Sequence, residues 1–438
     1  MLIEFKVENF LSIKNEETFT MQTAPYLKKF KESNTFLTKP VNILKSSLVF
    51  GPNGSGKTNL FNALLYMKNL ILDNFESPKK TLKSLPYQPF LMDNEFLEKP
   101  TKFQITLLID EEIFRYTFHY NKERILFESL DLLKSGKDVN YFNRKFNPQD
   151  NVYIYDFLDG VKDFQDITRG NVLYLSLLST KNDFIASKIL EWFENKLVYI
   201  GSDIGNVSSY KKIVDRLENP EIKENVINFL RMADFNIQDI EVRTKTITIP
   251  DDWKEIHALL DKIKDKFDTE STSEDVIRDI YTIYDTAQGL TAPVHVDSFE
   301  SRGTKKMLLI ATILFNALNN EGQTILMDEF DNAFHLAISL FLLKAMNSKD
   351  FNHNSQFILN THELALLKNN ILRVDQIWFA EKNKENVTEF YSLYDFNDSQ
   401  NRSRNDVSYA TDYMNGKYGA WPIVNEGVFK KLYEEEWK

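Results

Sequence analysis

Residues 48–60 have the sequence Leu-Val-Phe-Gly-Pro-Asn-Gly-Ser-Gly-Lys-Thr-Asn-Leu and decide the fold of this chain. The apolar residues 48–50 predict the end of a buried strand, and apolar residues at helical spacing follow from Leu60 onward. Strand, glycine loop and helix in this order are the context in which the pattern G-x-x-x-x-G-K-[ST] forms a phosphate-binding loop. Residues 51–58 match that pattern at every fixed position. The sequence therefore predicts a P-loop that binds a nucleoside triphosphate.

Each residue of this loop has an expected role. The glycines let the backbone curl so that its N–H groups point at the phosphates, and the following helix directs its positive end at the same charge. We expect Lys57 to reach the β- and γ-phosphates and the Thr58 hydroxyl to bind Mg²⁺. The alternative, a glycine-rich turn that matches by chance, is disfavoured by the intact pattern and its flanks. The other residues predicted to contact the nucleotide are Gly51, Pro52, Asn53, Gly54, Ser55, Gly56 and Asn59.

Composition and charge limit the class of protein. The 438 residues, 42% hydrophobic and 27% charged, are typical of a soluble globular protein with two or three structural units. No apolar stretch reaches the roughly 20 residues that span a bilayer, the N-terminus lacks the build of a signal peptide, and cysteine is absent. These features predict a cytoplasmic protein with no membrane partner and no disulfides. The net charge of -11 argues against a surface that binds nucleic acid throughout, although lysine clusters leave room for a local basic patch.

Alternating apolar residues predict strands on both sides of the loop. One strand is expected at residues 2–7, and three with short connections form an antiparallel β meander. The helix after Lys57 is expected to run to about Leu72. The predicted strands of the meander are 103–109, 113–120 and 125–133, with a further hairpin near 153–160.

The apolar spacing changes in the middle of the chain. From about residue 182 to residue 285 it is mostly helical, with one strand candidate at 240–249. We therefore predict an α/β P-loop NTPase core interrupted by a mostly helical insertion. The predicted division is 1–180 and 291–438 for the core and 181–290 for the insertion.

Two carboxylates end the strand predicted at 324–327. A buried parallel strand delivers its C-terminal residues to the edge of the sheet at which phosphates bind. We expect Asp328 to hold Mg²⁺, directly or through water, and Glu329 to accept a proton from the attacking water. An apolar strand that ends in Asp-Glu is common by itself, so the upstream P-loop is what favours the catalytic interpretation.

Three further segments carry candidate site residues. His362 follows the next predicted strand, where a neutral imidazole can donate a hydrogen bond to the γ-phosphate and orient the water; the alternative is a histidine that caps the following helix. Residues 301–304, Ser-Arg-Gly-Thr, begin a helix and form a second candidate anion site, although Ser and Thr also serve as plain caps. Gln88 offers a neutral oxygen for Mg²⁺ or the lytic water, and a solvated loop glutamine is an equal alternative.

The order of these segments resembles one superfamily. The order resembles that of the ATP-binding-cassette ATPases of the SMC and DNA-repair type. It runs from the P-loop through Gln88, residues 301–304 (the signature), the Asp-Glu pair and Asp331 to His362. Finer details resemble the abortive-infection branch of bacterial anti-phage systems, the RloA/AbiL-like ATPases related to the ATPase half of the OLD nucleases. The segments that carry this resemblance are 4–13, 300–304, 327–332 with His335, 361–363, 375–379 and 416–420.

The resemblance implies an SMC-head-like fold and a composite site. Two heads sandwich two ATP molecules, and Ser301 and Gly303 of one subunit touch the γ-phosphate held by Lys57 of the other. Thr304 belongs to the same nucleotide-binding signature, and Asp331 lies in the loop that couples the two sites. Compared with the transporter-like form Leu-Ser-Gly-Gly-Gln, arginine replaces the first glycine and threonine the glutamine. The residues that follow His362 are too few for the Toprim nuclease domain that OLD proteins carry, so a nuclease or toxin is expected to come from another chain.

We therefore expect an ATPase that uses ATP and Mg²⁺ and self-associates with nucleotide. By resemblance it senses phage infection and restrains or releases a separately encoded effector, a nuclease or toxin, with DNA or a phage component as a further candidate partner. The alternative is an SMC- or recombination-type ATPase that acts on DNA directly, which the acidic net charge and the lack of sustained heptads disfavour. A transporter's ATPase subunit is disfavoured by the meander and the insertion.

Overall fold

The structure is a computed structural model in which most of the chain is described. No helix of the described residues is long and apolar enough to cross a membrane. The chain divides into two compact units, Met1–Gly201 with Asn320–Lys438 and Ser202–Asn319. The described residues are 1–76, 84–134, 137–161, 164–201, 213–247, 275–318, 322–333, 335–368, 370–396 and 408–421.

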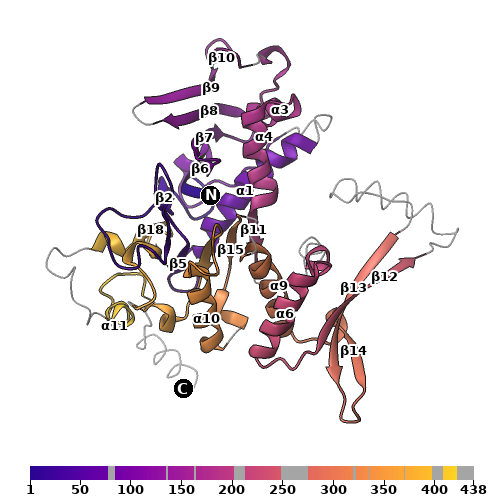
Figure 1. The fold of residues 1–438 in the computed structure, drawn as a ribbon. Helices are drawn as coiled ribbons and strands as arrows, with labels where there is room; N and C mark the ends of the chain where they lie inside the picture. The colour runs from indigo at the N-terminus through magenta and orange to yellow at the C-terminus, as the bar shows by residue number, and fades with distance from the viewer. Residues whose placement is uncertain are drawn as a thin grey trace, which may run out of the picture. The chain divides into compact units, whose positions relative to one another are not determined.

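The first unit contains the six-stranded sheet that carries the P-loop (Figure 1). Its strand β5 (Ser46–Phe50) is buried along its whole length and leads into the loop. The strands β11, β15, β16, β5 and β17 run parallel, and β18 is antiparallel to β17. The carboxyl ends of the parallel strands therefore lie at one edge of the sheet. In the order of the sheet, the other strands are β11 (Leu197–Ile200), β15 (Thr324–Met327), β16 (Gln356–Asn360), β17 (Ile377–Lys382) and β18 (Thr388–Ser392).

The helix α1 (Lys57–Glu76) begins inside the P-loop and is longer than predicted. Its end at Glu76 rather than near Leu72 is explained by the sequence, because neither glycine nor proline interrupts the chain before Pro78. Its apolar residues recur every three or four positions and are buried. They are Leu60, Phe61, Leu64, Met67 and Ile71.

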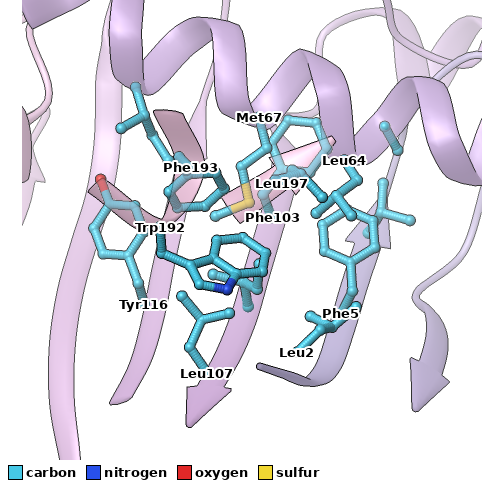
Figure 2. Close-up of a cluster of buried hydrophobic side chains, with 14 of the residues drawn as sticks. Leu2, Phe5, Leu64, Met67, Phe103, Leu107, Tyr116, Trp192, Phe193 and Leu197 are labelled. Atoms are coloured by element: carbon cyan, nitrogen blue, oxygen red, sulfur yellow. The ribbon is translucent and has the colours of Figure 1, made fainter. Parts of the chain in front are cut away.

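A seven-stranded antiparallel sheet completes the first unit's core and confirms the predicted meander. Strand β9 was not predicted, because its polar sequence Lys-Asp-Val-Asn-Tyr-Phe-Asn-Arg-Lys-Phe-Asn has little alternation. Figure 2 shows Leu64 and Met67 of α1 among Phe5, Phe103 and Leu107 of this sheet, so the helix and the sheet share one apolar core. In the order of the sheet, the strands are β10 (Val152–Phe157), β9 (Lys137–Asn147), β8 (Ile125–Lys134), β7 (Glu112–Tyr120), β6 (Thr101–Ile109), β1 (Leu2–Glu8) and β2 (Glu17–Thr20).

Short elements surround these two sheets. One of them, α2 (Asn94–Leu97), is a single helical turn within the stretch 79–100 that was predicted to be a loop. The others are β3 (Thr35–Phe36), β4 (Ile43–Leu44), α3 (Tyr174–Thr180), α4 (Phe184–Glu191), α10 (Leu336–Asn347) and α11 (Tyr409–Met414).

The second unit combines helices with a three-stranded antiparallel sheet in the order β12-β13-β14. The helical periodicity predicted as far as residue 285 is wrong for β13, whose alternating Ile280, Thr282 and Tyr284 follow a strand period that the surrounding helical pattern hid. Helices expected near 256–267 lie outside the described residues. The described elements are α6 (Pro220–Met232), β12 (Asp239–Ile247), β13 (Asp275–Asp285), β14 (Thr291–His295), α8 (Val296–Phe299) and α9 (Arg302–Asn316).

The predicted division of the chain differs from these compact units. The unit Ser202–Asn319 contains residues 291–319, which the sequence-based division assigned to the C-terminal part of the core. It therefore includes α9 and the predicted signature at its start, which follow β14 and the short helix α8. The boundaries 181–290 of the mostly helical insertion stay a prediction.

A fully buried ion pair connects the antiparallel sheet to α3. Arg144 Nε lies 3.3 Å from Glu128 Oε2, and neither side chain is exposed. The Glu128 carboxylate also accepts hydrogen bonds from Tyr116 Oη at 2.9 Å and from the backbone N–H groups of Tyr174 and Leu175 at 2.8 and 2.9 Å. Burial and the Glu128 charge raise the pKa of Tyr116 well above its usual range, so its hydroxyl remains a donor. The pair therefore fixes the start of α3 on the sheet.

We expect Glu128→Gln to lower the free energy of unfolding of this unit by about 3 kcal/mol or more, because it leaves the Arg144 charge buried without a counterion. Urea unfolding followed by tryptophan fluorescence measures this, since Trp192 lies in the same core. Asp138→Asn is the matched control, because it breaks an Arg–Asp pair on the same sheet whose side chains are 37% and 59% exposed. Equal losses for the two variants would contradict a special role for the buried pair.

Candidate nucleotide-binding site

The P-loop backbone passes close to the strands beside it. Gly51 has φ +154°, and a Cβ on it would lie 2.4 Å from the backbone oxygen of Ala380 in β17. Gly56 has φ +99°, and a Cβ there would lie 2.2 Å from Thr388 Oγ1 in β18. Only glycine satisfies both the backbone angle and the space at these two positions. The two glycines are therefore required by the packing of the loop as well as by phosphate binding.

A pocket of about 240 Å³ opens at the sheet edge where the parallel strands end. Its walls come from the P-loop, from the residues after β15 and from the end of β16, which lie far apart in the sequence. The structure thus brings together the P-loop, the Asp-Glu pair and the histidine that the sequence analysis selected. The lining residues are Asn53, Gly54, Gly56, Lys57, Thr58, Asn59, Asp328, Glu329, Asn360, Thr361 and His362.

The Lys57 amine points back to the loop in this structure. Its Nζ donates hydrogen bonds to the carbonyl oxygens of Gly51 at 2.8 Å and Pro52 at 2.9 Å. Burial lowers the pKa of Lys57 to about 8, although the nearby carboxylates, with Asp328 first, act in the opposite direction. A triphosphate in the pocket would offer this amine charged oxygens in place of neutral carbonyls.

Asp328 is held by Asn360, which the sequence analysis did not select. Asn360 Nδ2 donates to Asp328 Oδ1 at 3.0 Å, and both side chains are buried. Two buried oxygens at this edge, Asn360 Oδ1 and Ser55 Oγ, have no hydrogen-bond partner among the residues that the structure describes. A carboxylate, a hydroxyl and an amide oxygen are the hard ligands that Mg²⁺ prefers, so this donor set fits the ion. Asp328 and the Thr58 hydroxyl are the residues that would hold it.

Glu329 adopts a backbone conformation that is unusual for its residue type. Its φ is +50°, in the left-handed region, where residues other than glycine store strain that tends to be kept for a functional reason. Its carboxylate lines the pocket, and Oε2 accepts a hydrogen bond from Asn332 Nδ2 at 2.7 Å. The turn after β15 therefore places this carboxylate at the pocket.

His362 lines the pocket as a neutral imidazole. Burial and the charge of Lys57 lower its pKa, and neutral imidazole suits a hydrogen bond to a phosphate. Its backbone N–H donates to Asp331 Oδ1 at 3.2 Å, which connects the two segments after β15 and β16. The following short turn is capped by Glu363, whose carboxylate accepts from Ala365 N at 2.9 Å, so the histidine is not the cap.

Some predicted site residues lie elsewhere. The Gln88 side chain is exposed and outside the pocket, and its backbone oxygen accepts from Leu11 N at 3.0 Å, so the structure gives no support to a metal ligand there. Ser301, Gly303 and Thr304 belong to the second unit, where Ser301 is the N-cap of α9 and its Oγ accepts from Thr304 N at 3.1 Å.

A network of hydrogen-bonded hydroxyl groups that contacts the P-loop was not predicted from the sequence. Asn59 Nδ2 donates to Ser12 Oγ at 2.7 Å, Ser12 Oγ lies 2.7 Å from Thr388 Oγ1, and Thr388 Oγ1 donates to the Ser55 carbonyl at 2.9 Å. Ser12 falls within the segment 4–13 that carries the resemblance, whereas no sequence signal marks Thr388. These hydrogen bonds connect the P-loop to β18 and to the turn after β1 that contains Ser12.

A family model described as "AAA domain, putative AbiEii toxin, Type IV TA system" matches residues 47–368, which include the P-loop, the Asp-Glu pair and His362. The chain belongs to this family. It is therefore a P-loop ATPase of the AAA type, in agreement with the fold and the pocket described above. No curated protein sequence matches the chain.

Solved structures of SMC heads are similar to the chain at low identity. The SMC head domain from Thermotoga maritima is 13% identical, with 89% of this chain and 98% of that chain covered at a TM-score of 0.37. An SmcHead bound to the C-winged helix domain of ScpA is 14% identical, with 89% and 97% covered and a TM-score of 0.38. The Smc head domain bound to the C-terminal domain of ScpA derived from Pyrococcus furiosus is 13% identical, with 89% and 96% covered and a TM-score of 0.34.

We expect nucleotide binding to take up about 0.5 proton at pH 8 and about 0.1 at pH 7, because the free Lys57 amine, with a pKa of about 8, becomes fully protonated beside the phosphates. Calorimetric titration with ATP in buffers of different ionisation enthalpy measures this uptake. Lys45→Met is the matched control, because burial also lowers the pKa of Lys45 to about 8 but its amine contacts the Ser348 carbonyl. The assignment to Lys57 would be contradicted if the Lys45→Met variant took up no protons on binding ATP at pH 8. It would also be contradicted if the wild type took up none.

Proposed function

We propose that this protein hydrolyses ATP with Mg²⁺ at a site completed by a second copy of the chain, and that the resulting self-association regulates a separately encoded effector in an anti-phage abortive-infection system. The observation that carries the proposal is the single pocket that gathers the P-loop lysine, the Asp328–Glu329 pair and His362. A site that only binds a nucleotide would not need the Asp328–Glu329 pair or His362.

The chemistry follows from the positions of the side chains. Lys57 and the P-loop N–H groups bind the phosphates, and Thr58 and Asp328 would hold Mg²⁺, which neutralises charge on the β- and γ-oxygens when bound. Glu329, fixed by Asn332, accepts a proton from the attacking water. The neutral His362 donates a hydrogen bond to the γ-phosphate and keeps the water in line.

The second copy would supply the signature. By resemblance, Ser301, Gly303 and Thr304 of that copy contact the γ-phosphate from the side opposite the P-loop. The capped N-terminus of α9, fifteen residues long, is suited to an anion. The hydrogen bond between Asp331 and the His362 backbone gives a route by which the arrival of the second copy is sensed at the γ-phosphate.

A role in phage defence is supported by two observations. One is the description of the matched family, which refers to AbiEii and to type IV toxin–antitoxin systems. The other is the resemblance of segments at both ends of the chain to abortive-infection ATPases. The proposed partners are a second copy of this chain and a nuclease or toxin encoded separately, with DNA or a phage component as a further candidate partner.

We expect Glu329→Gln to reduce the ATP hydrolysis rate at least 100-fold while ATP still binds, because the amide cannot accept the water's proton. The variant should then accumulate as an ATP-bound oligomer. A phosphate-release assay and light scattering after size exclusion, with and without ATP, measure both effects. Glu389→Gln is the control, because it removes an exposed carboxylate of β18 that does not line the pocket.

Hydrolysis by Glu329→Gln at the wild-type rate would contradict the role given to this carboxylate. A monomer at saturating ATP would contradict the composite site. Adding duplex DNA to the same assay separates the two functions that the sequence leaves open. Strong stimulation of turnover, with binding that weakens steeply as salt is raised, would favour direct action on DNA over regulation of an effector.

A further inference from the structure

The carboxylate immediately before the signature serine is bound to β13. Glu300 follows α8, and its Oε1 accepts hydrogen bonds from the Thr282 hydroxyl and, at 2.8 Å, from Tyr284 Oη. Thr282 is fully buried, and the Glu300 charge together with burial raises the pKa of Tyr284 to about 12, so both hydroxyls remain donors. Because residues two apart on a strand share a face, one side of β13 presents both donors to one oxygen.

The other end of α8 is held by the same strand. His295, directly before α8, places Nε2 3.4 Å from Asp279 Oδ1 of β13 and Nδ1 3.1 Å from Ser298 Oγ. β13 thus contacts the residues on both sides of this four-residue helix. The Lys305 amine, one turn into α9, donates to the Asp297 carbonyl at 2.6 Å and joins α8 to α9.

Ser301 has little freedom between these contacts. Its hydroxyl is held by the Thr304 N–H at 3.1 Å and lies 2.9 Å from Thr304 Oγ1, and its carbonyl accepts from Lys305 N at 3.0 Å. A single peptide bond connects it to Glu300. The hydrogen bonds of Glu300 to Thr282 and Tyr284 therefore connect the signature turn to β13.

We propose that Glu300 is a positioning residue that holds the signature turn, through β13, in the orientation that contacts the γ-phosphate bound by a second copy. This inference rests on the proposed composite site. Its physical basis is preorganisation: charge-assisted hydrogen bonds to one rigid strand remove the conformational cost of ordering the turn when the two copies meet. Glu300 touches neither nucleotide nor the reacting water.

The test removes the hydroxyl groups of Thr282 and Tyr284 and leaves the residues of the signature unchanged. We expect Thr282→Val with Tyr284→Phe to slow ATP hydrolysis roughly tenfold and to weaken ATP-driven self-association, with affinity for ATP in the single chain unchanged within about twofold. Glu300→Ala should match this loss, and Glu300→Gln, whose amide oxygen still accepts both bonds, should recover most of the activity. Tyr281→Phe is the control, because that hydroxyl belongs to the opposite face of β13.

Ser301→Ala separates this inference from the function on which it rests. If Ser301→Ala hydrolyses ATP at the wild-type rate, the composite site is wrong. If Ser301→Ala is slow but Glu300→Ala and Tyr284→Phe, both folded by circular dichroism, are as fast as wild type, the positioning role is wrong and the composite site stands. In the Ser301→Ala background the β13 variants should cause no further loss, and an additional tenfold loss would also overturn the inference.

Discussion

The pairing of β5 with β16 on one side and β17 on the other is the interaction on which the rest of the structure depends. The register joins Val49 to Asn360 and Phe50 to Phe379, so β5 and β16 end at the same edge and β17 continues past it to Lys382. β15 pairs with β16 in the same sense. This alignment places the loop after β5, the carboxylates after β15 and the histidine after β16 around one pocket. A shift of one residue in any pair would turn these side chains to the other face of the sheet.

A lysine and several carboxylates lie close together at the pocket, where burial and the carboxylates have opposite effects on the protonation of the lysine. Burial favours a neutral Lys57, and the carboxylates of Asp328, Asp331 and Glu329 favour the charged form. His362 is kept neutral beside the same amine. Because these effects oppose each other, the protonation equilibrium of Lys57 is balanced near pH 8, and the charge of bound phosphates shifts it toward the protonated form.

Side-chain hydrogen bonds, some of them between segments far apart in the sequence, hold the groups that surround this pocket. Asn360 orients Asp328, Asn332 orients Glu329, and Thr388 supports the loop through the Ser55 carbonyl. In the second unit, Thr282 and Tyr284 do the same for Glu300 beside the signature. Each of these contacts fixes a predicted site residue or, for Glu300, the residue that precedes one.

The sequence by itself determined the P-loop, the parallel strand that ends in Asp328 and Glu329, and the position of His362 at the end of the next strand. Each of these is encoded by neighbouring residues, in a glycine pattern or an apolar run with a polar end, so local order is enough. Only the tertiary structure decided that Asn360 holds Asp328, that Thr388 leaves room for nothing larger than glycine at position 56, and that Gln88 does not line the pocket. It also decided that β13 is a strand. These features depend on contacts between residues far apart in the chain, and no local pattern records which distant side chain a residue will meet.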